Sequence, residues 1–180
     1  MRPMVVKGDA AVFDASPLIF LARVSLLEES LKLFSACLVA ETVKEEVVDT
    51  GKTVGAPETA ELESLIAKGR LAIERVPRTS LGLRLEANPR LSRGDRDSLV
   101  LASERTARLM ADDAAVRSVA NQLDVRLGGT LYVLSTMTDR GILKPAEAVD
   151  VLNRLVDSGW YCSARLYRAA RAALERRGSG

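Results

Sequence analysis

The sequence contains no histidine. Without an imidazole, the chain has neither a Ser-His-Asp nor a Cys-His nucleophile, and no histidine general base. Its only cysteines, Cys37 and Cys162, lie far apart, so a zinc site would have to combine two distant thiolates with carboxylates. Any hydrolysis is therefore expected to depend on carboxylates, which most readily hold Mg²⁺ or Mn²⁺.

Long apolar stretches are also missing. No uninterrupted apolar run is long enough to span a bilayer, and the start of the chain reaches Asp9 without the apolar region of a signal peptide. We therefore expect a soluble, cytoplasmic protein that does not interact with a membrane. The isolated cysteines fit such a location, because thiols stay reduced there.

Aromatic residues and net charge are both low. Aromatics make up 4 % of the 180 residues, so aliphatic side chains must fill the core. A hydrophobic content of 47 % at this length predicts one domain of ordinary size. The net charge of +2 excludes binding governed by overall positive charge, although a local basic patch stays compatible with it.

Short apolar runs alternate with helical patterns, which is typical of an α/β fold with a central, mainly parallel sheet of about five strands. The expected strands are 11–13, 37–40, 71–76, 107–111 and 125–127. The expected helices are 16–34 with a break near 24–25, 41–49, 58–68, part of 77–93, 95–106, 113–123, 130–141, 145–159 and 163–177. A loop is expected at 51–57, an N-terminal extension at 1–10 and a frayed tail at 178–180. Ser16, Thr130 and Ser163 are expected as N-caps.

Acidic residues directly follow two of the predicted strands. Asp14 comes after 11–13, and Asp112 and Asp113 come after 107–111. Ligands of parallel α/β sheets bind beyond the carboxyl ends of the strands, so these acids are expected at one edge. A carboxylate beside a core strand end is usually paired or liganded, which favours a site over a simple turn at Asp14. One acid of the later pair is expected to cap the following helix.

Helix phase selects Glu46 from the next acidic segment. At about 100° per residue, Glu46 lies about 60° from Val43, at the edge of the apolar stripe, and Glu45 lies on the far side. The alternative is that Glu46 is one more solvated acid on the surface of its helix.

The same argument applies to the segment 95–106. Asp97 stacks one turn before the apolar Val100 and Leu101, and Asp95 points roughly the other way. A first-turn position that favours the helix dipole is the alternative for Asp97. Asp95 is expected to be an N-cap rather than a ligand.

The predicted site combines acids that repel one another. Clustered carboxylates raise one another's pKa unless a cation neutralises them. Divalent ions would also ionise a bound water and stabilise both oxygens of an in-line phosphoryl displacement. The expected members are Asp14, Glu46, Asp97 and Asp113, with Asp112 and Asp95 in reserve.

Four segments together resemble a PIN domain. They are VFDASPLIFLARVSLLEESLKLF, VKEEVV, GDRDSLVLA and LMADDAAVRSVANQLDVRLGGTLYVLSTMTDRGIL. The chain is similar to a stand-alone prokaryotic branch of that superfamily, related to VapC-type toxins. The similarity runs from about Val12 to the C-terminal helix, and its most specific part runs from Asp112 through Arg117 to Thr130.

The resemblance implies a PIN-like three-layer α/β/α fold and a Mg²⁺- or Mn²⁺-dependent endoribonuclease with four acids. By position these acids are Asp14, Glu46, Asp97 and Asp113, with Ser16 and Thr130 in support. The branch often has Gly-Glu where this chain has Gly94-Asp95, and Thr where it has Ala111. It also implies an RNA substrate, a homodimer and an antitoxin protein as partner.

Two groups of arginines could contact RNA phosphates or form solvated faces. One group precedes the third acid; it comprises Arg78, Arg84, Arg90, Arg93 and Arg96. The other is a helical stripe of Arg165, Arg168 and Arg171. Arg90, Arg93 and Arg96 are the favoured RNA contacts because they adjoin the predicted site.

A PIN-like module that binds RNA or protein without cutting is the alternative function, supported by the departures at Asp95 and Ala111. A dehalogenase-type phosphatase fits less well because Ser16 stands where it would need a second Asp. A receiver domain would carry its paired acids after the first strand, not the fourth.

Overall fold

The computed structural model describes residues 9–177. Residues 1–8 of the predicted N-terminal extension and the predicted tail at 178–180 lie outside this range. In this range no helix combines the length and the apolar character needed to cross a membrane.

Five parallel strands form one central sheet in the order β3-β2-β1-β4-β5. The strands are β1 (Ala11–Phe13), β2 (Cys37–Ala40), β3 (Ala72–Glu74), β4 (Arg108–Met110) and β5 (Leu127–Gly128). The chain builds outward from β1 to β3 and then crosses to β4 on the other side of β1. The carboxyl ends of β1 and β4 therefore flank the topological switch point, where parallel α/β sheets bind ligands.

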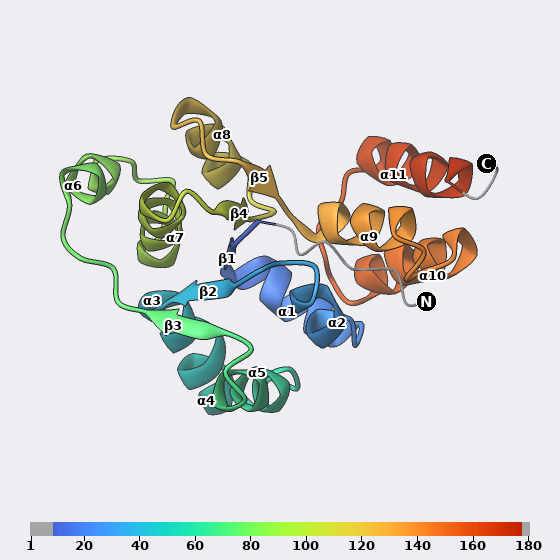
Figure 1. Cartoon of the computed structure of the whole chain (residues 1–180), viewed down its shortest axis with the longest axis horizontal. Helices are drawn as coiled ribbons and strands as arrows, with labels where there is room; N and C mark the ends of the chain where they lie inside the picture. The colour runs from blue at the N-terminus through green and yellow to red at the C-terminus, as the bar shows by residue number, and fades with distance from the viewer. Residues whose placement is uncertain (1–8, 178–180) are drawn as a thin grey trace.

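Helices cover both faces of this sheet, as Figure 1 shows, with α6, α7 and α8 on one side and α1, α2, α9 and α10 on the other. Their bounds are α1 (Ala15–Arg23), α2 (Leu27–Leu31), α3 (Glu41–Lys44), α4 (Gly51–Val54), α5 (Thr59–Ala67), α6 (Ser80–Glu86), α7 (Arg93–Glu104), α8 (Ala114–Gln122), α9 (Thr130–Asp139), α10 (Pro145–Asp157) and α11 (Ala164–Arg176). A π-helical stretch, η1 (Glu45–Thr50), joins α3 to α4. The predicted three-layer α/β/α arrangement is confirmed.

The predicted loop at 51–57 is wrong in its first half. The helix that starts at Glu41 continues through η1 into α4 and ends only at Gly55, whose φ of +68° is left-handed. A π-helix has a wider turn than an α-helix, so a phase calculated for 41–49 at the α-helical spacing does not strictly apply.

Three predicted caps are corrected by the structure. Ser16 and Thr130 lie inside the first turns of α1 and α9, because Asp14 and Gly129 hold the N-cap positions. Only Asp14 separates the end of β1 from the start of α1, so Asp14 rather than Ser16 occupies the N-cap position. Asp95 is also not an N-cap: Ser92 caps α7, and Asp95 completes the capping box from the third helical position.

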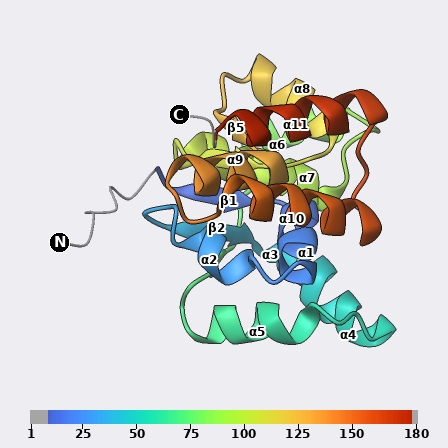
Figure 2. The same cartoon turned by 90° about the vertical axis from the view of Figure 1, so that its right-hand side faces the viewer.

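Two apolar clusters stabilise the fold. The larger surrounds β1, β2 and β4 and contains the buried face of α7. The smaller lies between α9, α10 and α11 and includes Leu134, Leu152, Trp160 and Leu174. Figure 2 shows these three helices side by side on the face toward the viewer. This second cluster places Trp160 near the switch point.

Candidate metal centre

Asp14 is the most buried acid of the predicted site, with 4 % of its surface exposed. It lies between β1 and α1, and its backbone amide donates to the Met110 carbonyl of β4 at 3.0 Å. Its Oδ1 accepts a hydrogen bond from Oγ of Ser98 at 3.2 Å. The pKa of Asp14 is raised to about 7, mainly by burial and then by the neighbouring charges of Asp95 and Glu46, whereas hydrogen bonds from the Ala15 amide and Ser98 lower it.

Asp95 and Glu46 face Asp14 from two further elements. Asp95 lies in the first turn of α7, one turn before Ser98, and its charge raises the pKa of both Asp14 and Glu46. The side chain of Glu46 is exposed as a whole, yet removal of its carboxyl from water is the main cause of its raised pKa. The three acids therefore share one electrostatic environment.

The predicted orientation of Asp95 is wrong. The prediction took Val100 and Leu101 as the buried side of α7. Gly94 and Ser98 are buried as well, so the buried surface of the helix is wider than its apolar residues indicate. Asp95 shares the face of Ser98, which touches Asp14.

Asp97 lies on a different side of α7. Its Oδ2 accepts a hydrogen bond from Oγ1 of Thr42 at 2.8 Å, and the side chain lines a surface pocket beside Arg78 and Arg93. Asp97 is not among the groups that shift the pKa of Asp14 or Glu46. Its role as a ligand stays a prediction.

Glu46 and Glu45 both reach the start of α7, but at different residues. A Cβ on Gly94 of α7 would lie 3.3 Å from Oε2 of Glu46, so this carboxyl packs directly on the start of α7. Glu45 is exposed and lies 4.0 Å from Nη1 of Arg93.

Asp112 is the centre of a hydrogen-bond network at the end of β4. Its Oδ2 accepts from Oγ1 of Thr130, from Nε1 of Trp160 at 3.0 Å and from Oγ of Ser16 at 3.4 Å. Its Oδ1 accepts from the Thr130 amide at 2.8 Å. This acid therefore ties the start of α1 to the start of α9 and to the segment after α10. A Cβ on Gly129 would lie 2.6 Å from Oδ1 of Asp112, so glycine is required there.

Asp113 caps α8, which confirms that one acid of this pair is an N-cap. Its Oδ1 accepts from the amides of Ala115 at 2.8 Å and Val116 at 3.1 Å, and the residue is exposed. Of the two neighbouring acids, Asp112 is the one whose side chain reaches α1 through Ser16. The assignment of Asp113 as the fourth ligand stays a prediction.

The acidic side chains are of the right chemical type to bind a divalent cation, but they are not close enough together to surround one. Within residues 9–177, no three acids, cysteines or histidines lie close enough together to hold a metal ion. The carboxylates of Asp14, Glu46 and Asp95 are nevertheless the hard oxygen ligands that Mg²⁺ and Mn²⁺ prefer. A cation would also relieve the like-charge repulsion that raises the pKa of Asp14.

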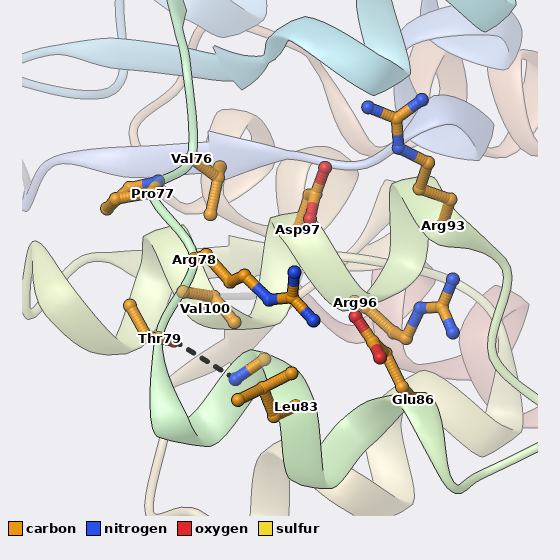
Figure 3. Close-up of a pocket in the computed structure, with 11 residues that line it drawn as sticks. Val76, Pro77, Arg78, Thr79, Leu83, Glu86, Arg93, Arg96, Asp97 and Val100 are labelled. Atoms are coloured by element: carbon orange, nitrogen blue, oxygen red, sulfur yellow. Dashed lines mark hydrogen bonds between the residues drawn. The ribbon is translucent and has the colours of Figure 1, made fainter.

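An arginine pocket lies beside these acids, defined by Arg78, Arg93, Arg96 and Asp97. It has a volume of about 320 Å³ between α6, α7 and the segment after β3. Figure 3 shows Arg78 between Asp97 and Glu86, with the guanidinium groups of Arg93 and Arg96 farther out on one side of the hollow. Of the three arginines predicted to contact RNA, Arg93 and Arg96 line this pocket. Arg90 is exposed and does not line it.

Sequence reasoning missed Ser98 and Trp160. Ser98 is completely buried and bonds to Asp14; its place three residues after Asp95 is the signal that could have identified it. Trp160 contacts Asp112 across 48 positions of sequence, for which no local pattern gives a signal.

A parallel sheet with acidic side chains at its topological switch point places the chain among α/β domains with an acidic site. A family model described as PIN domain, DUF3368, matches residues 10–176, and the chain belongs to this PIN-domain family. PIN domains are generally nucleases and typically bind divalent metals. No curated protein matches the chain significantly.

Proposed function

We propose that this protein is a Mg²⁺- or Mn²⁺-dependent endoribonuclease that hydrolyses RNA phosphodiester bonds. The observation that carries the proposal is the buried Asp14 carboxyl, which faces the charges of Asp95 and Glu46 at the switch point of a PIN fold. Burial of one acid among others is costly for folding, and a bound cation would offset that cost.

The proposed ligands are Asp14, Glu46 and Asp95, with Asp112, Asp113 and Asp97 as further candidates. Ser98 holds Oδ1 of Asp14 in place, η1 carries Glu46, and the first turn of α7 carries Asp95, whose charge acts on both other acids. When bound, a divalent cation supplies the positive charge that ionises water and stabilises phosphoryl oxygens. The three guanidinium groups of the arginine pocket, which Asp97 and Glu86 also line, support binding of neighbouring phosphates without reading sequence.

The similarity to the VapC-related branch extends this proposal. It supports a cytoplasmic toxin of a toxin–antitoxin pair that acts as a homodimer and is held by an antitoxin protein. An adjacent reading frame for a small DNA-binding protein would support this extension, and its absence would favour a different cellular role.

The test compares the parent protein with Asp14→Asn on a labelled single-stranded RNA in Mn²⁺. We expect Asp14→Asn to cleave roughly 100-fold more slowly or worse. Asp150→Asn on the exposed side of α10 is the matched control and should cleave like the parent. Equal rates for the parent and Asp14→Asn would overturn the assignment.

A non-catalytic binding module is the second candidate. It is favoured by the four hydrogen bonds that Asp112 already accepts and by the separation of the acids. Calorimetric titration with Mn²⁺ separates the two functions. Uptake of Mn²⁺ that is lost in Asp14→Asn supports the nuclease, and no uptake by the parent supports the binding module.

A further inference from the structure

A second hollow shares the Asp112 side chain with the acid site. Its volume is about 320 Å³, and we call it the aromatic pocket, defined by Asp112, Arg117, Tyr132, Trp160, Tyr161 and Leu166. It lies between the start of α9 and the segment that joins α10 to α11. Three of the seven aromatic residues of the chain line it, although aromatics are rare in this sequence.

Trp160 and Tyr161 are neighbours in sequence but have opposite environments. Trp160 is 5 % exposed, packs in the apolar cluster of α9–α11 and donates its Nε1 proton to Asp112. Tyr161 is 88 % exposed at the rim of the pocket. The buried ring fixes the backbone, so the next residue presents its ring to solvent at a defined place beside Asp112.

A fixed positive charge accompanies these rings. The guanidinium of Arg117 lines the pocket and donates to the carbonyls of Ala111 at 2.9 Å and Gly128 at 2.8 Å, which holds it at the pocket wall. An exposed aromatic face beside a held cation matches the base and the phosphate of a single-stranded nucleic acid.

We propose that the aromatic pocket binds an unpaired nucleobase of the RNA strand, with the base stacked on Tyr161. This inference rests on the proposed function, because the pocket shares Asp112 with the candidate ligands and would hold a base of the strand whose phosphodiester lies at the acids. Stacking on an aromatic side chain tolerates any base, so the pocket favours single-stranded over double-stranded RNA without reading sequence.

The sole tryptophan of the chain provides the readout. A ten-nucleotide single-stranded RNA of mixed sequence, added in EDTA so that no cleavage occurs, is expected to quench Trp160 fluorescence. Tyr161→Ala should weaken this binding roughly 5- to 100-fold, and Tyr161→Phe should restore it to within about twofold. Val54→Ala, which removes another exposed apolar side chain on α4, should bind as the parent does. A double-stranded RNA of the same sequence should quench less.

The proposal is overturned if saturating RNA leaves the fluorescence unchanged, or if Tyr161→Ala binds as tightly as the parent. It is also overturned if Tyr161→Ala alters only the oligomeric state, which would make the pocket a protein interface. Cleavage in Mn²⁺ is measured separately. Cleavage without quenching would reject the base-binding pocket and support the nuclease. Quenching without cleavage would reject the nuclease and support the base-binding pocket. Tyr161 is exposed, so its variants are expected to melt like the parent.

Discussion

The hydroxyl of Ser98 donates to Oδ1 of Asp14 at 3.2 Å, and both residues are buried where α7 meets the start of α1. This bond lowers the pKa of Asp14, whereas burial and the charges of Asp95 and Glu46 raise it. Ser98 therefore favours the ionised form of Asp14, which is the form that binds a metal.

Removal of the Ser98 hydroxyl is predicted to weaken the metal site. Ser98→Ala should raise the pKa of Asp14 further and lower Mn²⁺ affinity roughly tenfold or more, as loss of a bond that orients a ligand usually does. Ser103→Ala, at an exposed position of the same helix, is the control. Calorimetric titration with Mn²⁺ measures the effect, and unchanged affinity in Ser98→Ala would show that Ser98 serves packing alone.

The stability of the metal-free protein is predicted to fall as pH rises. The folded pKa of Asp14 is raised from 3.8 to about 7, so between these values the folded state binds more protons than the unfolded state. The stabilising proton is fully present below about pH 4 and is lost as pH rises through about 7, at a cost on the order of a few kcal/mol. Added Mg²⁺ should restore stability at the higher pH.

Asp14→Asn tests this electrostatic cost directly, because the amide carries no charge. In EDTA at about pH 8, its melting midpoint should exceed that of the parent by several degrees, and near pH 5 the difference should shrink. Asp150→Asn should change neither value. An Asp14→Asn protein that melts lower than the parent at about pH 8 would mean that the carboxylate already has a compensating partner.

Sequence patterns predicted the sheet and the place of Asp14 at the end of a buried strand, because both depend on local signals. Short apolar runs define buried strands, and Asp14 directly follows one of them. The partner acids depend on how helices rotate against the sheet. The face of α7 toward Asp14 carries Gly94 and Ser98, which no hydrophobic pattern marks, and η1 changes the helical spacing at Glu46. Tertiary packing therefore decides that the charge of Asp95 acts on Asp14 and Glu46.

Asp95 and Asp97 are predicted to differ in their effect on cleavage. Asp95→Asn removes a charge that acts on Asp14 and Glu46, so kcat should fall roughly 100-fold and the pKa of Asp14 should fall as well. Asp97→Asn leaves that charge in place and should cost less than about tenfold. Steady-state cleavage of RNA in Mn²⁺ gives both values. A larger loss for Asp97→Asn would restore the assignment that helix phase favoured.

The arginine pocket is predicted to bind phosphate by charge. Arg96→Ala should weaken RNA binding in EDTA for all sequences alike and flatten its dependence on salt by about 0.7 for each phosphate that is no longer neutralised. Arg168→Ala on the exposed side of α11 is the matched control. Titrations at several salt concentrations give the slope. If Arg168→Ala flattens the slope and Arg96→Ala does not, the stripe on α11 is the RNA-binding surface.

Gly94 is predicted to be needed for the position of Glu46. A Cβ at Gly94 would lie 3.2 Å from Cγ2 of Val43 and 3.3 Å from Oε2 of Glu46, so alanine must displace the carboxyl or separate α3 from α7. At Gly82 in α6 the nearest contact would be an ordinary 3.4 Å, to Oγ1 of Thr79.

The two glycine variants therefore separate helix propensity from site geometry. Alanine favours a helix over glycine by about 1 kcal/mol, so Gly82→Ala should raise the melting midpoint and leave Mn²⁺ affinity within about twofold of the parent. Gly94→Ala should gain less stability and lose roughly tenfold in Mn²⁺ affinity, because Glu46 no longer reaches its place beside Asp95. If Gly94→Ala binds Mn²⁺ as tightly as Gly82→Ala, Glu46 does not hold the metal and the site must draw its third acid from elsewhere.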